Sequence, residues 1–94
     1  MTTVKFDTIF LMDIVCKELA EAEELSNELG RLASAGYLTS QTGLDVAEEM
    51  RTHLVKAHNI LCEVDVPEAE PQKLYAAVTL ANHDRLIKMI KLSM

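Results

Sequence analysis

The sequence predicts an all-α protein, namely a three-helix antiparallel bundle with a long first helix that forms a homodimer. Good helix formers, mainly Leu, Ala, Glu, Lys and Met, dominate the 94 residues, whereas aromatic residues make up only 4%. Apolar residues recur every three or four positions in three separate segments, which is the period of one helix face. No segment alternates apolar and polar residues over the length of a strand, so we expect no sheet. The whole chain, residues 1–94, is expected to be one helical domain.

The first predicted helix covers about residues 8–35 and would be roughly 42 Å long at ~1.5 Å per residue. This segment contains no proline and a single glycine, Gly30. Its apolar stripe consists of Leu11, Met12, Val15, Leu19, Ala22, Leu25, Leu29 and Leu32. We expect Asp7 or Thr8 to cap the start of the helix, and Gly36 to end it in the left-handed conformation.

The second predicted helix covers about residues 42–64. Thr42 and Asp45 have the spacing of a capping pair at its start. Its apolar stripe consists of Ala47, Met50, Leu54, Ala57, Leu61 and Val64. The connection to the first helix, residues 37–43, is short and polar, which favours antiparallel packing of the two helices.

The acidic segment 63–71 is predicted to be a linker, because Pro67 has no amide hydrogen and disfavours a helical conformation at the residue before it. Pro71 suits the first turn of the third predicted helix, about residues 72–92. The residues available for burial on this helix are Leu74, Ala77, Leu80, Ala81, Ile87, Ile90 and Met94. Residues 82–85 form a polar belt, which we expect to be an exposed turn of the helix.

Apolar side chains surround the start of the first helix on every side, with only Asp13 between them. A helix that is apolar all round must be covered all round, which one neighbouring helix cannot do. This end either lies at the centre of a three-helix core or is an interface with a second copy or another protein. We favour the interface, because few other residues are available to cover this end. The expected partner or dimer interface comprises Phe6, Phe10, Leu11, Met12, Ile14 and Val15.

The net charge of −6 argues against a general nucleic-acid binder or a binder of anionic membranes. The charge is unevenly divided, because residues 1–72 carry −9 and residues 73–94 carry +3. In the last segment Arg85, Lys88 and Lys91 form a candidate basic patch, which could contact phosphates. The simpler explanation is that a basic helix packs beside an acidic one and places cations at its own negative end. Acidic mimicry of nucleic acid is a third hypothesis, and it would use Glu18, Glu21, Glu24 and Glu28.

Residues suited to chemistry are few. His58 and Cys62 are four apart, so both could face one metal ion, but no third ligand has the spacing of a metal motif. His83 and Asp84 are neighbours in sequence, and adjacent side chains on a helix do not face each other. The chain has no Gly-rich phosphate loop, G-x-S-x-G elbow or H-E-x-x-H motif. We therefore expect no catalytic residue, cofactor, metal site or small-molecule substrate, and no enzyme activity.

The two cysteines lie in apolar helical surroundings without the spacing of a disulfide framework, which indicates reduced thiols in the cytoplasm. The apolar run at residues 9–16 is too short to span a membrane, and no export signal is found. The favoured hypothesis is a non-catalytic interaction module, a small helical dimer or adaptor that binds and regulates or inhibits another protein. The alternative is a nucleic-acid-associated regulatory protein that uses the basic third helix.

Overall fold

In the computed structural model the backbone is described for residues 2–64 and 67–94, and the side chains for residues 8–64 and 67–94. The described chain forms α1 (Thr2–Ser34), α2 (Gln41–Glu63), the short 3-10 helix η1 (Pro67–Ala69) and α3 (Glu70–Ser93). No strand occurs in these ranges, so the all-α prediction is confirmed. None of the described helices has an apolar stretch that is long enough to cross a membrane.

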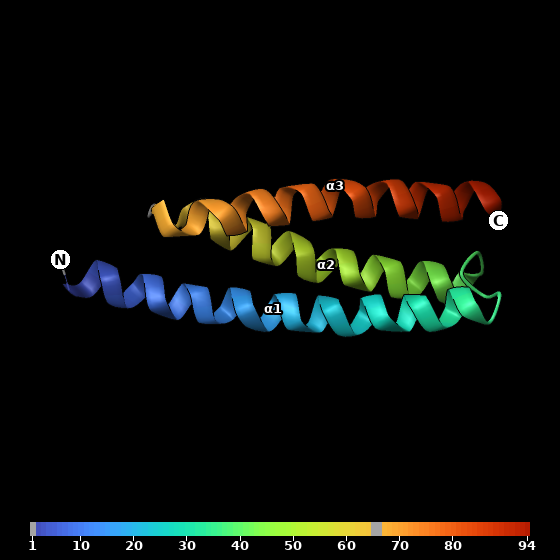
Figure 1. Cartoon of the computed structure of the whole chain (residues 1–94), viewed down its shortest axis with the longest axis horizontal. Helices are drawn as coiled ribbons and strands as arrows, with labels where there is room; N and C mark the ends of the chain where they lie inside the picture. Colours follow the sequence, from blue (N-terminus) through green and yellow to red (C-terminus); the bar gives the residue numbers. More distant parts are fainter. Residues whose placement is uncertain (1, 65–66) are drawn as a thin grey trace.

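The three α-helices lie side by side in an elongated molecule with principal extents of 52 × 18 × 15 Å. The chain reverses direction at each connection, and α2 lies between α1 and α3 (Figure 1). Accordingly, α2 packs against both of its neighbours. The first turns of α1 extend beyond the start of α3, which leaves this end with fewer neighbours than the middle of the molecule (Figure 1).

The helix starts differ from those predicted, most of all in the first helix. α1 begins at Thr2 rather than near residue 8, because residues 2–7 contain neither glycine nor proline and extend the helix without a break. The expected cap at Asp7 or Thr8 is therefore wrong, since both residues lie inside α1. Within the predicted linker, residues 67–69 form η1 and residue 70 already belongs to α3, while residues 65–66 lie outside the described residues.

The end of α1 confirms the role expected of Gly36, which has a φ of 82°. The backbone N–H of Tyr37 donates to the carbonyl oxygen of Leu32 with an N···O distance of 2.8 Å. The N–H of Gly36 donates to the carbonyl oxygen of Ala33 at 3.1 Å. These two bonds form a Schellman motif, which satisfies carbonyl groups at the end of the helix and turns the chain toward α2.

At the start of α2 the cap is Ser40 and not Thr42. The Ser40 Oγ accepts a hydrogen bond from the backbone N–H of Gly43 at 3.3 Å, and Ser40 has an extended backbone. Thr42 lies inside the helix. Asp45 accepts a hydrogen bond from the side-chain amide of Gln41, with an Nε2···Oδ1 distance of 2.8 Å. The helix therefore begins at Gln41, directly after this cap.

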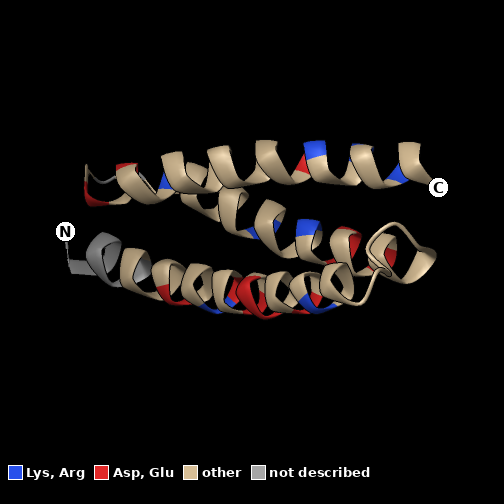
Figure 2. Ribbon diagram, turned by 45° about the vertical axis from the view of Figure 1, so that its right-hand side comes forward, with Lys and Arg blue, Asp and Glu red and all other residues tan. Residues whose placement is uncertain are grey.

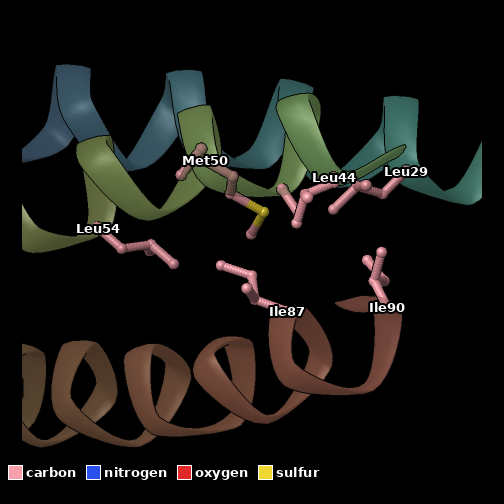
Figure 3. Close-up of a cluster of buried hydrophobic side chains, with 8 residues drawn as sticks. Leu29, Leu44, Met50, Leu54, Ile87 and Ile90 are labelled. Atoms are coloured by element: carbon pink, nitrogen blue, oxygen red, sulfur yellow. The ribbon is translucent and has the colours of Figure 1, made fainter. Parts of the chain in front are cut away.

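Two clusters of buried apolar side chains hold the helices together. The first core cluster contains Ala22, Leu29, Leu44, Ala47, Met50, Leu54, Ile87 and Ile90, which come from all three α-helices. Figure 3 shows the α3 residues of this cluster pointing at those of α1 and α2. The second core cluster contains Val15, Ala57, Leu61, Val64, Ala69 and Ala76. The predicted apolar stripe of α2 is confirmed, because each of its members belongs to one of these clusters.

The buried face of α3 differs from the prediction. Leu74 is 68% exposed, and Ala77, Ala81 and Met94 are also exposed, whereas Ile87 and Ile90 are buried as expected. The expectation of an exposed polar belt is wrong for His83, which is only 5% exposed. Its Nε2 donates to the carbonyl oxygen of Ala47 on α2 at 2.6 Å. This hydrogen bond reduces the cost of burying a polar ring against α2.

Candidate functional site

The exposed apolar residues of α1 lie near its start. Ile9 is 64% exposed and Phe10 is 61% exposed, so two large side chains next to each other face solvent. Ile14, one turn later, is half-buried. The side chain of Phe6 lies outside the described residues. Ile9 was not among the residues of the expected interface, although it belongs to the same apolar run.

The other members of the expected interface pack within the chain. Val15 is 1% exposed and belongs to the second core cluster. Leu11 and Met12 are partly buried and pack against the same cluster. Two explanations were considered for this apolar end, a place in the core and an interface. They apply to different residues, since Val15 lies in the core and Phe10 lies at the surface.

The largest set of exposed apolar side chains lies on α3. Five large apolar residues of this helix are more than half exposed, namely Leu74, Tyr75, Val78, Met89 and Leu92, and so is Met94 directly after it. This surface was not predicted, because Leu74 and Met94 were expected to lie in the core. The sequence of α3 does indicate such a surface, because apolar residues occur on both sides of the helix and a single buried face could not hold them all.

The residues of the candidate basic patch, Arg85, Lys88 and Lys91, are all exposed on α3. Two of them line an open hollow of about 510 Å³ between α2 and α3. The lining residues are Glu48, Arg51, Asp84, Ile87, Lys88, Lys91 and Leu92. Charges of both signs thus meet in this region, as Figure 2 also shows for the two helices. The carboxylate of Asp84 pairs with Arg51, with an Nε···Oδ1 distance of 2.6 Å.

Acidic residues gather in the middle of α1 (Figure 2), and two of them contact α2. Glu18 Oε2 lies 2.5 Å from His53 Nδ1, and Glu21 Oε2 lies 3.3 Å from His53 Nε2. His53 is therefore held between two carboxylates of the neighbouring helix. Further along α1, Glu28 pairs with Arg31. Three of the four residues considered for acidic mimicry, Glu18, Glu21 and Glu28, thus have ionic or hydrogen-bonding partners within the chain.

The residues considered for chemistry make local contacts. Cys62 Sγ lies 3.8 Å from His58 Nε2, as their spacing predicts. Over residues 8–64 and 67–94, no group of three or more His, Cys, Asp or Glu side chains is arranged to hold a metal ion. His83 is bonded to the Ala47 carbonyl and Asp84 to Arg51, so these neighbours on α3 point to different partners on α2.

Comparison with protein-family models, with curated proteins and with solved structures finds no match for the chain. The features that bear on function are therefore those of the surface itself. They are the two exposed apolar residues near the start of α1, the five on α3 with Met94 after them, and the mixed charges beside α2.

Proposed function

We propose that the protein is a non-catalytic protein–protein interaction module, a small helical homodimer or adaptor that binds another protein and regulates or inhibits it. The observation that supports this proposal best is the exposure of five large apolar side chains on α3 and of Met94 directly after it. Large apolar side chains that gather on one surface helix commonly mark contacts with other proteins.

The position of the exposed residues adds support. Ile9 and Phe10 lie near the start of α1. The exposed apolar residues of α3 lie on one of the two outer helices (Figure 1). Both surfaces belong to helices, which bind partners by placing an apolar face into a groove or against another helix. A homodimer that covers one surface would leave the other available to a different protein.

The proposal is tested by light scattering on the purified protein over a concentration series. One chain has a mass of 10.5 kDa, and we expect twice this mass at high concentration with dissociation on dilution. Phe10→Asp and Val78→Asp place a charge separately on the α1 surface and on the α3 surface. Loss of the two-chain mass in either variant supports an apolar helix face as the contact. A one-chain mass at every concentration contradicts the homodimer, and an unchanged two-chain mass in both variants contradicts the apolar contact.

A further inference from the structure

Four of the exposed apolar residues of α3 belong to a regular stripe. Its members are Tyr75, Val78, Asn82, Arg85, Met89 and Leu92, hereafter the outer stripe, and all six are exposed. They are separated by alternating steps of three and four residues, which is the spacing of the contact positions in a coiled coil. The buried residues of α3, such as His83 and Ile87, face α2, so the outer stripe is available to a further helix.

The outer stripe has the same order of polarity when it is read in either direction. Two apolar residues are followed by two polar residues and then by two apolar residues. If two copies of α3 pack antiparallel, with the twofold axis between residues 83 and 84, Tyr75 lies opposite Leu92 of the second copy. In the same way Val78 lies opposite Met89. A surface that is complementary to itself under a twofold axis is what an isologous dimer requires.

The polar centre of the stripe selects the antiparallel direction. In this arrangement Asn82 lies opposite Arg85 of the second copy, and its side-chain carbonyl oxygen can accept a hydrogen bond from the guanidinium group. Parallel packing would instead place Arg85 directly opposite Arg85, and such like charges at a contact cost free energy. The positions beside the stripe add no further repulsion, because Leu74, Thr79, Ala81 and Leu86 are uncharged and only Lys88 carries a charge.

We propose that two copies of this chain dimerise by antiparallel packing of their outer stripes. This inference rests on the proposed function and assigns a contact surface to its homodimer. It differs from dimerisation through the start of α1, where only Ile9 and Phe10 are strongly exposed among the described residues. The outer stripe offers four apolar residues per chain at coiled-coil spacing, and it leaves Phe10 uncovered for another partner.

Disulfide cross-linking tests the direction and the register of the packing. Cys16 and Cys62 are exposed and are first replaced by serine. Val78→Cys is then introduced in one preparation and Met89→Cys in another. In the antiparallel dimer, position 78 faces position 89 of the second copy. Two cysteines at position 78 would instead lie about 16 Å apart along the helix axis, well beyond the ~4.4–6.8 Å between Cα atoms that a disulfide needs.

With oxidised glutathione as the oxidant, we expect the mixture of the two variants to form a covalent heterodimer, and neither variant alone to form a covalent dimer. Mass spectrometry distinguishes these products. Ala77→Cys mixed with Met89→Cys is the matched control, because Ala77 is exposed but lies outside the outer stripe. Covalent dimers in each single preparation would indicate parallel packing and overturn the inference. Equal cross-linking in the control mixture would indicate random collision and would also overturn it.

Charge substitutions give an independent measurement. Val78→Asp should reduce the mass in solution to that of one chain, whereas Ala77→Asp should keep the two-chain mass, with equal helix content by circular dichroism. The wild type could instead have the two-chain mass, with Val78→Asp keeping this mass and Phe10→Asp reducing it to one chain. That result overturns this inference and leaves the proposed function standing. A wild-type mass of one chain at all concentrations overturns the homodimer itself.

Discussion

Gly43, in the first turn of α2, has no space for a side chain. A Cβ atom there would lie 2.0 Å from the carbonyl oxygen of Leu38 and 2.7 Å from its carbonyl carbon. These are backbone atoms, so they cannot rotate away as the end of a side chain could. Glycine is therefore required where the connection from α1 passes over the start of α2, close to the Ser40 cap.

We expect Gly43→Ala to lower the free energy of unfolding by about 1–3 kcal/mol, because the backbone must shift to admit the methyl group. Gly30→Ala is the matched control. Gly30 lies in an exposed helical position where a new Cβ would meet nothing within 4 Å, so this change should raise stability by about 0.5–1 kcal/mol. Urea unfolding of both variants at one protein concentration measures the difference. Equal stability of Gly43→Ala and the wild type would contradict the close contact.

His83 shows how one hydrogen bond allows a polar residue to occupy the core. The ring is 5% exposed, and its Nε2 reaches the Ala47 carbonyl. Because a carbonyl oxygen only accepts, Nε2 carries the proton in this contact. The imidazole thus fills space between α2 and α3 and also links α3 to the backbone of α2, which an apolar side chain of the same size would not do.

Replacing His83 with alanine should lower the free energy of unfolding by about 2 kcal/mol, because both the hydrogen bond and the buried ring are lost. Lys88→Ala, on the exposed side of the same helix, should change it by no more than about 0.5 kcal/mol. Thermal or urea unfolding provides the measurement. If both variants unfold alike, His83 does not pack as described.

Among the helices, α1 has the most varied surroundings along its length. Its middle and end pack against α2 through residues such as Ala22 and Leu29, whereas Phe10 near its start is mostly exposed. Val15 marks the change between these environments, because it is the first residue of the described part of α1 that is fully buried. The same helix thus supplies both core and surface.

This division predicts different effects for two apolar residues of α1. Val15→Ala should lower the free energy of unfolding by about 2 kcal/mol, because it removes buried methyl groups and leaves a cavity. Phe10→Ser should change the stability of the chain by about 0.5 kcal/mol or less, since the ring is 61% exposed. Chemical unfolding of the two variants measures both effects. A large loss in Phe10→Ser would show that the ring is buried within the folded chain.

The molecule as a whole is a rod of 52 × 18 × 15 Å in which α2 lies between its two neighbours. Neighbouring helices cover α2 on two sides, and α1 and α3 each keep an outer side open (Figure 1). Stability should therefore vary along the rod, because the free energy of local opening depends on how many buried contacts must be broken.

Hydrogen exchange should reveal this gradient. We expect backbone amides around Phe10 to exchange much faster than those around Leu54, because Leu54 is 2% exposed and belongs to a cluster formed by all three α-helices. Mass spectrometry of proteolytic peptides from these two regions of the exchanged protein gives the comparison. Similar protection at both sites would mean that the start of α1 is covered, either by a second copy or by another part of the chain.

Much of the fold follows from local features of the sequence. Helix-forming composition and periodic apolar residues are sufficient to predict three helices, and the stripe of α2 is correctly predicted because this helix has one clear apolar period. The turn at Gly36 is also predictable, because a left-handed residue at a helix end strongly favours glycine. These features depend on residues that are close to one another along the chain.

Which face of α3 is buried was decided only by the tertiary structure. Apolar residues occur on both sides of this helix, so periodicity alone could not select His83 over Leu74 for the core. The selection came from the carbonyl of Ala47, which accepts a hydrogen bond from His83, and from the small side chain of Ala76, which belongs to the second core cluster. In the same way Val15 and Phe10 are both apolar residues of one helix, and only the position of α2 separates a core residue from a surface residue. The sequence determined where the helices form, because this depends on neighbours along the chain, whereas contacts between distant residues determined which surfaces remain open.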